Sequence, residues 1–487
     1  MRARLSRAFR KYFLEFLMNK NFKVVFSKAR NALMVVNEAT ASVQHKGAKT
    51  VIAAAVASLV AGAALAESAY KDPVTGATEF TAATTQDKVV ANNKFVGTGG
   101  QTMSWLQNGS LAADQNLWVV PVDTKDTRLT GLYAYGEDKT ATNAGTIYVQ
   151  ANGTNTKAYQ NRAMMADNGG EAVNNGTIVA KSGYGMTIGS TGTGSTITNN
   201  KSIIVEDWGV GMELGAGKMA AGVNNGTITV GKASPSIKDA YTIGVLVKGS
   251  GADNGKPSTF TNYGTIDAAE GTAAISIEGQ DSTGQVETNV KVVLAEGSVT
   301  KGDINVKETV DKDTHYRVTA AIDIDAGATV EGDINVNSAD ADKNNVMLDI
   351  AGTNGVGTVH GALNAKGKTT TNLSGDLAFE QVNVAGGTVT LGKVVGGEAS
   401  LTFVDPKAKA NEPQISVTGN GTFVIDQYGT VTADTAKVDG GKFENKGVLT
   451  VTDLTVASAT DGSPFVTSGT SNITNLTVTG KTANAVE

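Results

Sequence analysis

Short runs of alternating apolar and polar residues recur along the chain, and Gly or Asn bounds most of them. The commonest run reads N-x-G-T-I-x-V, in which Ile and Val two residues apart point to the same side of an extended strand. Runs of this length between turn residues are typical of β-strands, so the pattern predicts an all-β body. Copies of the phrase begin at Asn143, Asn174, Asn199, Asn224, Asn262 and Asn445.

The spacing of the phrase indicates how the strands are assembled. The first five copies lie 31, 25, 25 and 38 residues apart. Between copies stand a Gly-rich phrase, such as GYGMTIG from Gly183 and GVGMELG from Gly209, and a third short piece that leads into the next Asn. Three short strands per unit fit the three walls of a coil of roughly 25 residues. We therefore predict a right-handed parallel β-helix, whose coils bury their apolar sides on one another.

The phrase also predicts local geometry. Its Gly is expected to supply a positive-φ corner that other residues resist. The six leading asparagines are expected to form a turn ladder, in which side chains ~4.8 Å apart hydrogen-bond up the stack.

Two other fold classes compete with the β-helix. Asn-Gly is also a strong hairpin signal, as in an antiparallel sandwich or bacterial Ig-like modules. Disorder competes because 58 of the 487 residues are Gly. The return of a whole phrase at the coil period favours the β-helix over the sandwich, and Val and Ile at strand spacing oppose disorder.

Charge is distributed unevenly. The first 66 residues hold 11 Lys and Arg against 2 Asp and Glu, which leaves 30 basic and 45 acidic residues, a net charge of −15, for the remainder. The remainder has three arginines, Arg128, Arg162 and Arg317. A body this acidic and poor in Arg is unsuited to nucleic acid, so no nucleic-acid partner is expected.

An apolar, uncharged segment of 16 residues runs from Thr50 to Leu65. It is shorter than the ~20 residues of a membrane span, although a retained anchor is the alternative. Ala64, Leu65 and Ala66 form a small-x-small pattern, so cleavage of a signal peptide is expected between Ala66 and Glu67.

The sequence before this segment is too long for an ordinary signal peptide. Residues 18–49 contain a run of recognisable features: Met18-Asn19-Lys20, Lys23-Val24-Val25, Lys28, Asn31, Val35-Val36 and Glu38-Ala39. Through these features they resemble the extended signal peptide region of large type V secretion substrates, although Asn37 stands where that family has a small hydroxyl residue. We expect Met18 to be the initiator and residues 1–17 to be an upstream extension.

Together with the repeats, the resemblance extends to pertactin-like passengers of autotransporters. It implies export through the Sec translocon and the periplasm, and delivery by an outer-membrane translocator barrel to the bacterial cell surface or the medium. No run of ~10-residue barrel strands is visible, so the barrel is expected outside this chain. The expected domains are a helical signal segment at 1–66, an N-terminal cap with first coils at 67–135, and β-helix repeats at 136–487.

Candidate catalytic residues are few. After signal removal only His315 and His360 remain, and no Ser nucleophile motif accompanies them. No Cys/His cluster or phosphate loop is present. We therefore expect no catalytic, cofactor or metal site. The acidic residues that recur at repeat spacing, or that alternate with Ile and so face solvent, are Asp303, Asp333, Asp323 and Asp325.

These observations favour a non-enzymatic surface or secreted passenger. It would act as an adhesin or structural stalk that contacts host or bacterial surface molecules, or other copies of itself. The alternative is a β-helical polysaccharide hydrolase or lyase, which needs carboxylates and Arg convergent in a groove. Scattered acidic residues and three arginines favour the stalk.

Overall fold

The computed structural model describes residues 22–27, 32–37, 69–71, 78–81, 88–90, 96–98 and 102–479, the last span with breaks at 120–128, 151–160, 182, 190–193, 207–208, 216–218, 232–241, 249–255, 280–286, 312–313, 339–344, 393–396, 405–411 and 458–462. By its contacts the chain divides into two units. The first is Met1–Lys71 with Ala77–Ala83, and the second is Asp72–Gly76 with Thr84–Glu487.

The described part of the first unit consists of two antiparallel strand pairs. Strand β1 (Phe22–Ser27) pairs with β2 (Ala32–Asn37), and β3 (Ala69–Lys71) pairs with β4 (Thr78–Thr81). The helix expected over residues 1–66 is not found in the described residues of that segment, which form the strands β1 and β2. The other residues of the signal segment lie outside the described ones.

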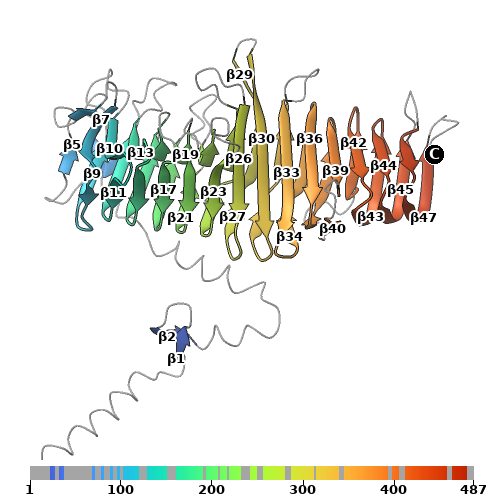
Figure 1. Cartoon of the computed structure of the whole chain (residues 1–487), viewed down its shortest axis with the longest axis horizontal. Helices are drawn as coiled ribbons and strands as arrows, with labels where there is room; N and C mark the ends of the chain where they lie inside the picture. The colour runs from blue at the N-terminus through green and yellow to red at the C-terminus, as the bar shows by residue number, and fades with distance from the viewer. Residues whose placement is uncertain are drawn as a thin grey trace, which may run out of the picture. The chain divides into compact units, whose positions relative to one another are not determined.

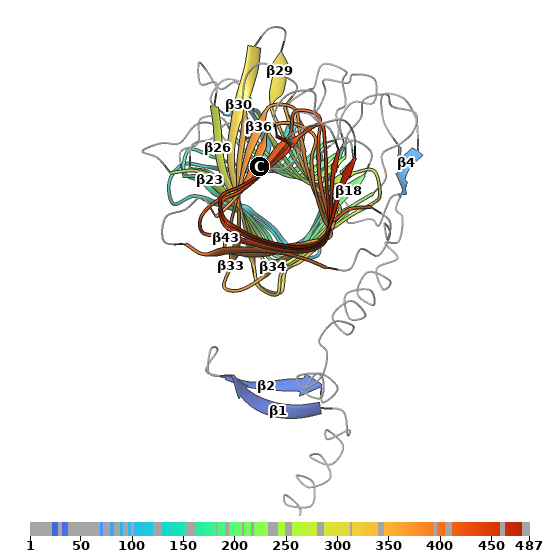
Figure 2. The ribbon, with the colours of Figure 1, turned by 90° about the vertical axis from the view of Figure 1, so that its right-hand side faces the viewer.

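The second unit is a stack of coils with three parallel walls, and this confirms the predicted parallel β-helix class. Figure 1 shows its strands side by side in chain order, and Figure 2 shows them surrounding a common axis. Along each wall, a strand pairs in parallel with its counterpart one coil earlier and one coil later. Wall 1 is the 15-stranded sheet, and walls 2 and 3 together form the 28-stranded sheet.

The strands of each wall recur once per coil. Wall 1 contains β8 (Ser110–Leu111), β11 (Thr140–Asn143), β14 (Glu171–Asn174), β17 (Thr196–Asn199), β20 (Ala221–Asn224), β23 (Ser258–Asn262), β26 (Glu287–Leu294), β30 (Thr314–Asp325), β33 (Val346–Thr353), β36 (Thr369–Ser374), β39 (Thr388–Leu391), β42 (Thr422–Ile425), β44 (Lys442–Asn445) and β46 (Phe465–Thr467). Wall 2 contains β5 (Lys88–Val90), β9 (Asn116–Val119), β12 (Thr146–Gln150), β15 (Thr177–Lys181), β18 (Ser202–Glu206), β21 (Thr227–Val230), β24 (Thr265–Ala268), β27 (Val299–Lys301), β31 (Thr329–Glu331), β34 (Gly357–His360), β37 (Asp376–Phe379) and β40 (Ala399–Phe403). Wall 3 contains β7 (Thr102–Gln107), β10 (Leu129–Tyr135), β13 (Arg162–Asp167), β16 (Tyr184–Ile188), β19 (Val210–Leu214), β22 (Ile243–Val247), β25 (Ala273–Glu278), β28 (Asp303–Lys307), β32 (Ile334–Asn337), β35 (Ala362–Lys366), β38 (Gln381–Val384) and β41 (Ile415–Thr418).

Two hairpins depart from the parallel pattern. Strand β6 (Val96–Thr98) pairs antiparallel with β7, and β29 (Thr309–Asp311) pairs antiparallel with the start of β30. In Figure 1, β29 and the adjoining end of β30 rise beyond the neighbouring strands of wall 1.

In the last described coils, walls 2 and 3 merge. Strand β43 (Gly429–Asp439) pairs with β40 through its first residues and with β41 through its last ones. It is followed by β45 (Val448–Ala457) and β47 (Thr470–Thr479), which pair along nearly their whole length. The corner between the two walls is therefore crossed by continuous strands.

The core lies inside the coils and follows the repeated phrase. The Ile of the phrase forms a column in wall 2 whose members, Ile147, Ile178, Ile203, Ile228 and Ile266, are aligned in register and fully buried. Burying a side chain of this size contributes about 1.5–3 kcal/mol relative to exposure. Each coil thus covers the apolar side of the next, as in other stacked repeats.

Gly is required in the phrase for a different reason from the one predicted. Gly145, Gly176, Gly226 and Gly264 are not among the residues with positive φ, so the expected positive-φ corner is wrong. The backbone of the preceding coil passes too close for a side chain instead. A Cβ on Gly176 would stand 2.0 Å from the carbonyl oxygen of Gly145, and one on Gly264 would stand 2.0 Å from that of Gly226.

Candidate functional site

Five of the six phrase asparagines form one continuous column inside wall 1. Asn143, Asn174, Asn199, Asn224 and Asn262 end successive strands, pair in register, and are fully buried. The Nδ2 of each of the first four donates to the Oδ1 of the next, at 2.7, 2.8, 2.8 and 2.8 Å. We call this column the interior ladder.

Each amide in the interior ladder also donates to the backbone of the following coil. The Nδ2 of Asn174 reaches the carbonyl oxygen of Ser202 at 3.1 Å, and that of Asn224 reaches Thr265 at 3.2 Å. The ladder ends where the Nδ2 of Asn262 donates to the Oγ1 of Thr300 at 3.1 Å. Because buried amides cost free energy unless they are paired, these bonds hold the stack together but present nothing to a ligand.

Asn445 lies apart from the other five. After Asn262, the same column continues with Leu294 and Ile324, so aliphatic residues interrupt the row. Asn445 is buried in β44 and bonds to the following coil: its Nδ2 donates to the carbonyl oxygen of Thr470 at 2.8 Å and to the Oγ of Ser471 at 2.9 Å.

The candidate acidic residues serve contacts between coils. The Oδ1 of Asp303 accepts the backbone N–H of Asp333 at 3.0 Å, and the Oδ1 of Asp333 accepts that of Ala362 at 2.8 Å. Asp323 pairs with the Nζ of Lys291 at 2.5 Å. The Oδ1 of Asp325 accepts the hydroxyl of Thr353 at 2.5 Å, so each of these four carboxylates is engaged by a neighbouring coil.

The two histidines lie on different walls. His315 is in β30, opposite Val310 in the hairpin register, and His360 ends β34 on wall 2. Among the residues that the structure describes, no group of three or more His, Asp or Glu side chains is arranged to hold a metal ion.

Wall 3 carries a second amide ladder, which the repeated phrase did not predict. Asn335 donates to Asn305, Asn364 to Asn335 and Asn383 to Asn364, each from Nδ2 to Oδ1 at 3.0 Å. All four are half-buried. The signal for this ladder was an Asn between two apolar residues in β28, β32, β35 and β38, but only the register shows that these residues stack.

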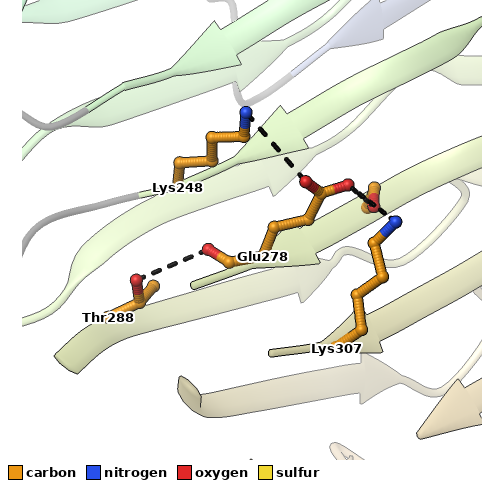
Figure 3. Close-up of polar contacts among 5 residues, drawn as sticks. Lys248, Glu278, Thr288 and Lys307 are labelled. Atoms are coloured by element: carbon orange, nitrogen blue, oxygen red, sulfur yellow. Dashed lines mark hydrogen bonds and ion pairs between the residues drawn. The ribbon is translucent and has the colours of Figure 1, made fainter. Parts of the chain in front are cut away.

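A chain of charges also crosses wall 3. Buried Glu278 contacts the Nζ of Lys307 at 3.3 Å through Oε1 and that of Lys248 at 4.0 Å through Oε2, so one carboxylate joins three successive coils (Figure 3). Glu213 lies on the same wall in β19. Burial raises the pKa of Glu213 above its ordinary value, Lys248 and Arg162 lower it, and Glu278 raises it.

Most residues of the predicted export signal lie outside the described ones. Met18, Ala66 and Glu67 are not described, so the initiator and the cleavage position stay predictions. Among the described residues, no helix has the length and apolar character needed to cross a membrane.

Comparison with known proteins gives one match. Residues 18–67 match the family model described as the extended signal peptide of the type V secretion system. No curated protein and no solved structure matches the chain. Such a signal implies export by Sec and an outer-membrane translocator, which accords with a repetitive β-helix behind it. The chain therefore carries the extended signal peptide of type V secretion ahead of a β-helical body, as autotransporter passengers do, and is exported through the periplasm to the cell surface or the extracellular space.

Proposed function

We propose that the exported chain is a non-enzymatic passenger that acts by surface contact, as an adhesin or a structural stalk. The observation that carries this proposal is the use of the polar side chains. The described candidate carboxylates bond to neighbouring coils, and repeated amides form ladders along the stack. A stack built in this way is rigid and offers long polar faces.

A polysaccharide hydrolase or lyase would use its side chains differently. General acid–base work on a glycosidic bond needs two carboxylates that face one substrate across a short gap. Here Asp303 and Asp333 are occupied by backbone amides, and Asp323 by Lys291. These contacts favour a supporting role for the acidic residues.

The proposal is tested by adhesion and degradation assays on the same exported protein. We expect it to bind cultured host cells, or to aggregate the bacteria that carry it, and to release no sugar from a panel of plant, bacterial and host polysaccharides. Sugar release that disappears in Asp333→Asn or Asp323→Asn would contradict the proposal and favour the enzyme. Absence of both adhesion and aggregation would also count against it.

A further inference from the structure

An exposed row of residues marks the corner between walls 1 and 2. It consists of the residue after each asparagine of the interior ladder: the half-buried Ala144, followed by the exposed Asn175, Asn200, Asn225 and Tyr263. We call this row the corner strip. From Asn175 onward, each backbone N–H in the row donates to the carbonyl oxygen of a ladder asparagine one coil earlier, at 2.7, 2.8, 2.7 and 2.8 Å. The interior ladder thus fixes the position of the strip outside it.

From Asn175 onward, the side chains of the corner strip are aligned as well as exposed. The Nδ2 of Asn200 donates to the Oδ1 of Asn175, and that of Asn225 to the Oδ1 of Asn200, both at 2.8 Å. One proton of each of these amides is used in this way, so the outer amide hydrogens and oxygen lone pairs face solvent. Tyr263 follows in the next coil with 57% of its surface exposed, the largest exposure among the large apolar and aromatic residues described.

A column of hydroxyl side chains runs beside the corner strip. Two residues after each strip position, at the start of the wall 2 strands, stand Thr146, Thr177, Ser202, Thr227 and Thr265, all half-buried and in register. A row of amides and a row of hydroxyls therefore run side by side along the stack, and successive members of each row are ~4.8 Å apart. Only Lys201 adds a charge between the two rows, on a body whose net charge is −15.

We propose that the corner strip binds an extended, neutral polysaccharide that lies along the stack. Amide and hydroxyl groups hydrogen-bond sugar hydroxyls as both donors and acceptors. The ring of Tyr263 offers an aromatic face on which the apolar face of one sugar ring packs. The coil spacing is close to the rise of one sugar along an extended glycan, so successive rings meet successive coils. This inference rests on the proposed function and names the partner of one face.

The geometry favours a glycan over a second copy of this chain. The strip is one row of exposed side chains with a half-buried row of hydroxyl side chains beside it, which suits a single extended chain. A stable protein–protein contact needs about 800 Å² from each partner, and two bodies of net charge −15 repel each other. The row is also held by backbone bonds before any ligand arrives, so binding orders little of the protein.

The test uses the exported protein and titration calorimetry with cellohexaose, laminarihexaose, chitohexaose and maltohexaose, with a heparin oligosaccharide as the anionic probe. We expect at least one neutral hexasaccharide to bind and heparin not to bind. Tyr263→Ala should weaken that binding by about tenfold, and Asn200→Ala by a few-fold. The matched control is Tyr135→Ala, which removes another exposed tyrosine, on wall 3, and should leave affinity unchanged.

Three results would overturn the inference. They are the absence of binding to every neutral probe, equal weakening by Tyr263→Ala and Tyr135→Ala, and a Tyr263→Ala effect on self-association alone, measured by sedimentation. Thermal unfolding of each variant shows that a lost affinity is not lost folding. If the protein still adheres to cells while it binds none of the probes, this inference fails and the proposed function stands.

Discussion

A buried asparagine is tolerated only where its amide is paired, and the interior ladder pairs one in each of five successive coils. Asn199 shows the arrangement: its Oδ1 accepts from Asn174, and its Nδ2 donates to Asn224 and to the carbonyl oxygen of Thr227. The row has a direction, because every amide donates toward the C-terminal coil. A single break therefore leaves an unpaired group on both sides.

We predict that Asn199→Ala lowers the free energy of unfolding by about 2 kcal/mol, because it strands the amide of Asn174 and the oxygen of Asn224 in the interior. Urea denaturation measures the loss. The matched control is Asn200→Ala, which removes an exposed asparagine next to it and should cost about 0.5 kcal/mol or less. Equal losses in the two variants would show that the interior ladder contributes nothing of its own.

We predict opposite pH dependences for two glutamates. The pKa of Glu213 is raised in the folded protein. Its contribution to the free energy of unfolding is therefore fully present below the ordinary carboxyl pKa, about 4.3, and is lost as pH rises through the folded-state pKa. Glu213→Gln should therefore raise the thermal midpoint at pH 7 and leave it nearly unchanged at pH 4.

The pKa of Glu444 is shifted in the opposite direction from that of Glu213. A hydrogen bond from Lys442 is the main cause that lowers the pKa of Glu444. Its contribution to the free energy of unfolding is thus present above the ordinary carboxyl pKa and is lost as pH falls through the folded-state pKa. Glu444→Gln should lower the thermal midpoint at pH 7 and have little effect in acid. Midpoint shifts of the same sign for both variants at pH 7 would contradict these assignments.

At the scale of the strands, register is kept while connections vary. Asn199 and Asn224 are 25 residues apart and Asn224 and Asn262 are 38 apart, yet both pairs stack at 2.8 Å. A one-residue slip would turn the apolar side of a strand outward, so burial of the Ile column enforces the register. Extra residues must then lie between strands rather than within them.

Close approach between coils makes some glycines irreplaceable. A Cβ on Gly352, near the end of β33, would stand 1.8 Å from the carbonyl oxygen of Asp376. We predict that Gly352→Ala lowers the free energy of unfolding by about 1–3 kcal/mol, because the backbone of one coil must move. Gly231→Ala is the control, since its nearest neighbour, the carbonyl oxygen of Val205, would be 3.3 Å away. Denaturation midpoints that fall equally in both variants would refute the steric explanation.

At the scale of the whole molecule, each coil of the second unit contacts chiefly its neighbours, so stability is nearly a sum over coils and interfaces. We predict that deletion of residues 200–224, one 25-residue coil, joins Asn199 to Asn225 in register and leaves a folded, slightly less stable protein. Circular dichroism and thermal unfolding measure this. Deletion of residues 200–212, about half a coil, should abolish cooperative unfolding; equal tolerance of the two deletions would contradict a stacked repeat.

Export requires removal of the signal peptide at a defined position. The exported protein should begin at Glu67, as N-terminal sequencing would show, because a signal peptidase requires small residues at Ala64 and Ala66. Ala66→Phe should leave the signal uncleaved and the chain held at the inner membrane. Leu65→Val, at the position between them, is the control and should be processed normally. A mature N-terminus elsewhere would refute the assigned cleavage position.

The sequence by itself determined the fold class and the export route. Ile and Val at strand spacing, repeated with each N-x-G-T phrase, require a stacked β-structure, and residues 18–67 carry the secretion signal. Only the tertiary structure decided which repeated residues meet. It linked the asparagines from Asn143 to Asn262 in one ladder and left Asn445 outside it. It also placed Asn305 and Asn383 in a second ladder that the repeated phrase did not predict. It also replaced the positive-φ explanation of Gly176 by close packing. The reason is that a sequence period gives the strand pattern within a coil, whereas contacts between coils depend on register and on the length of each connection.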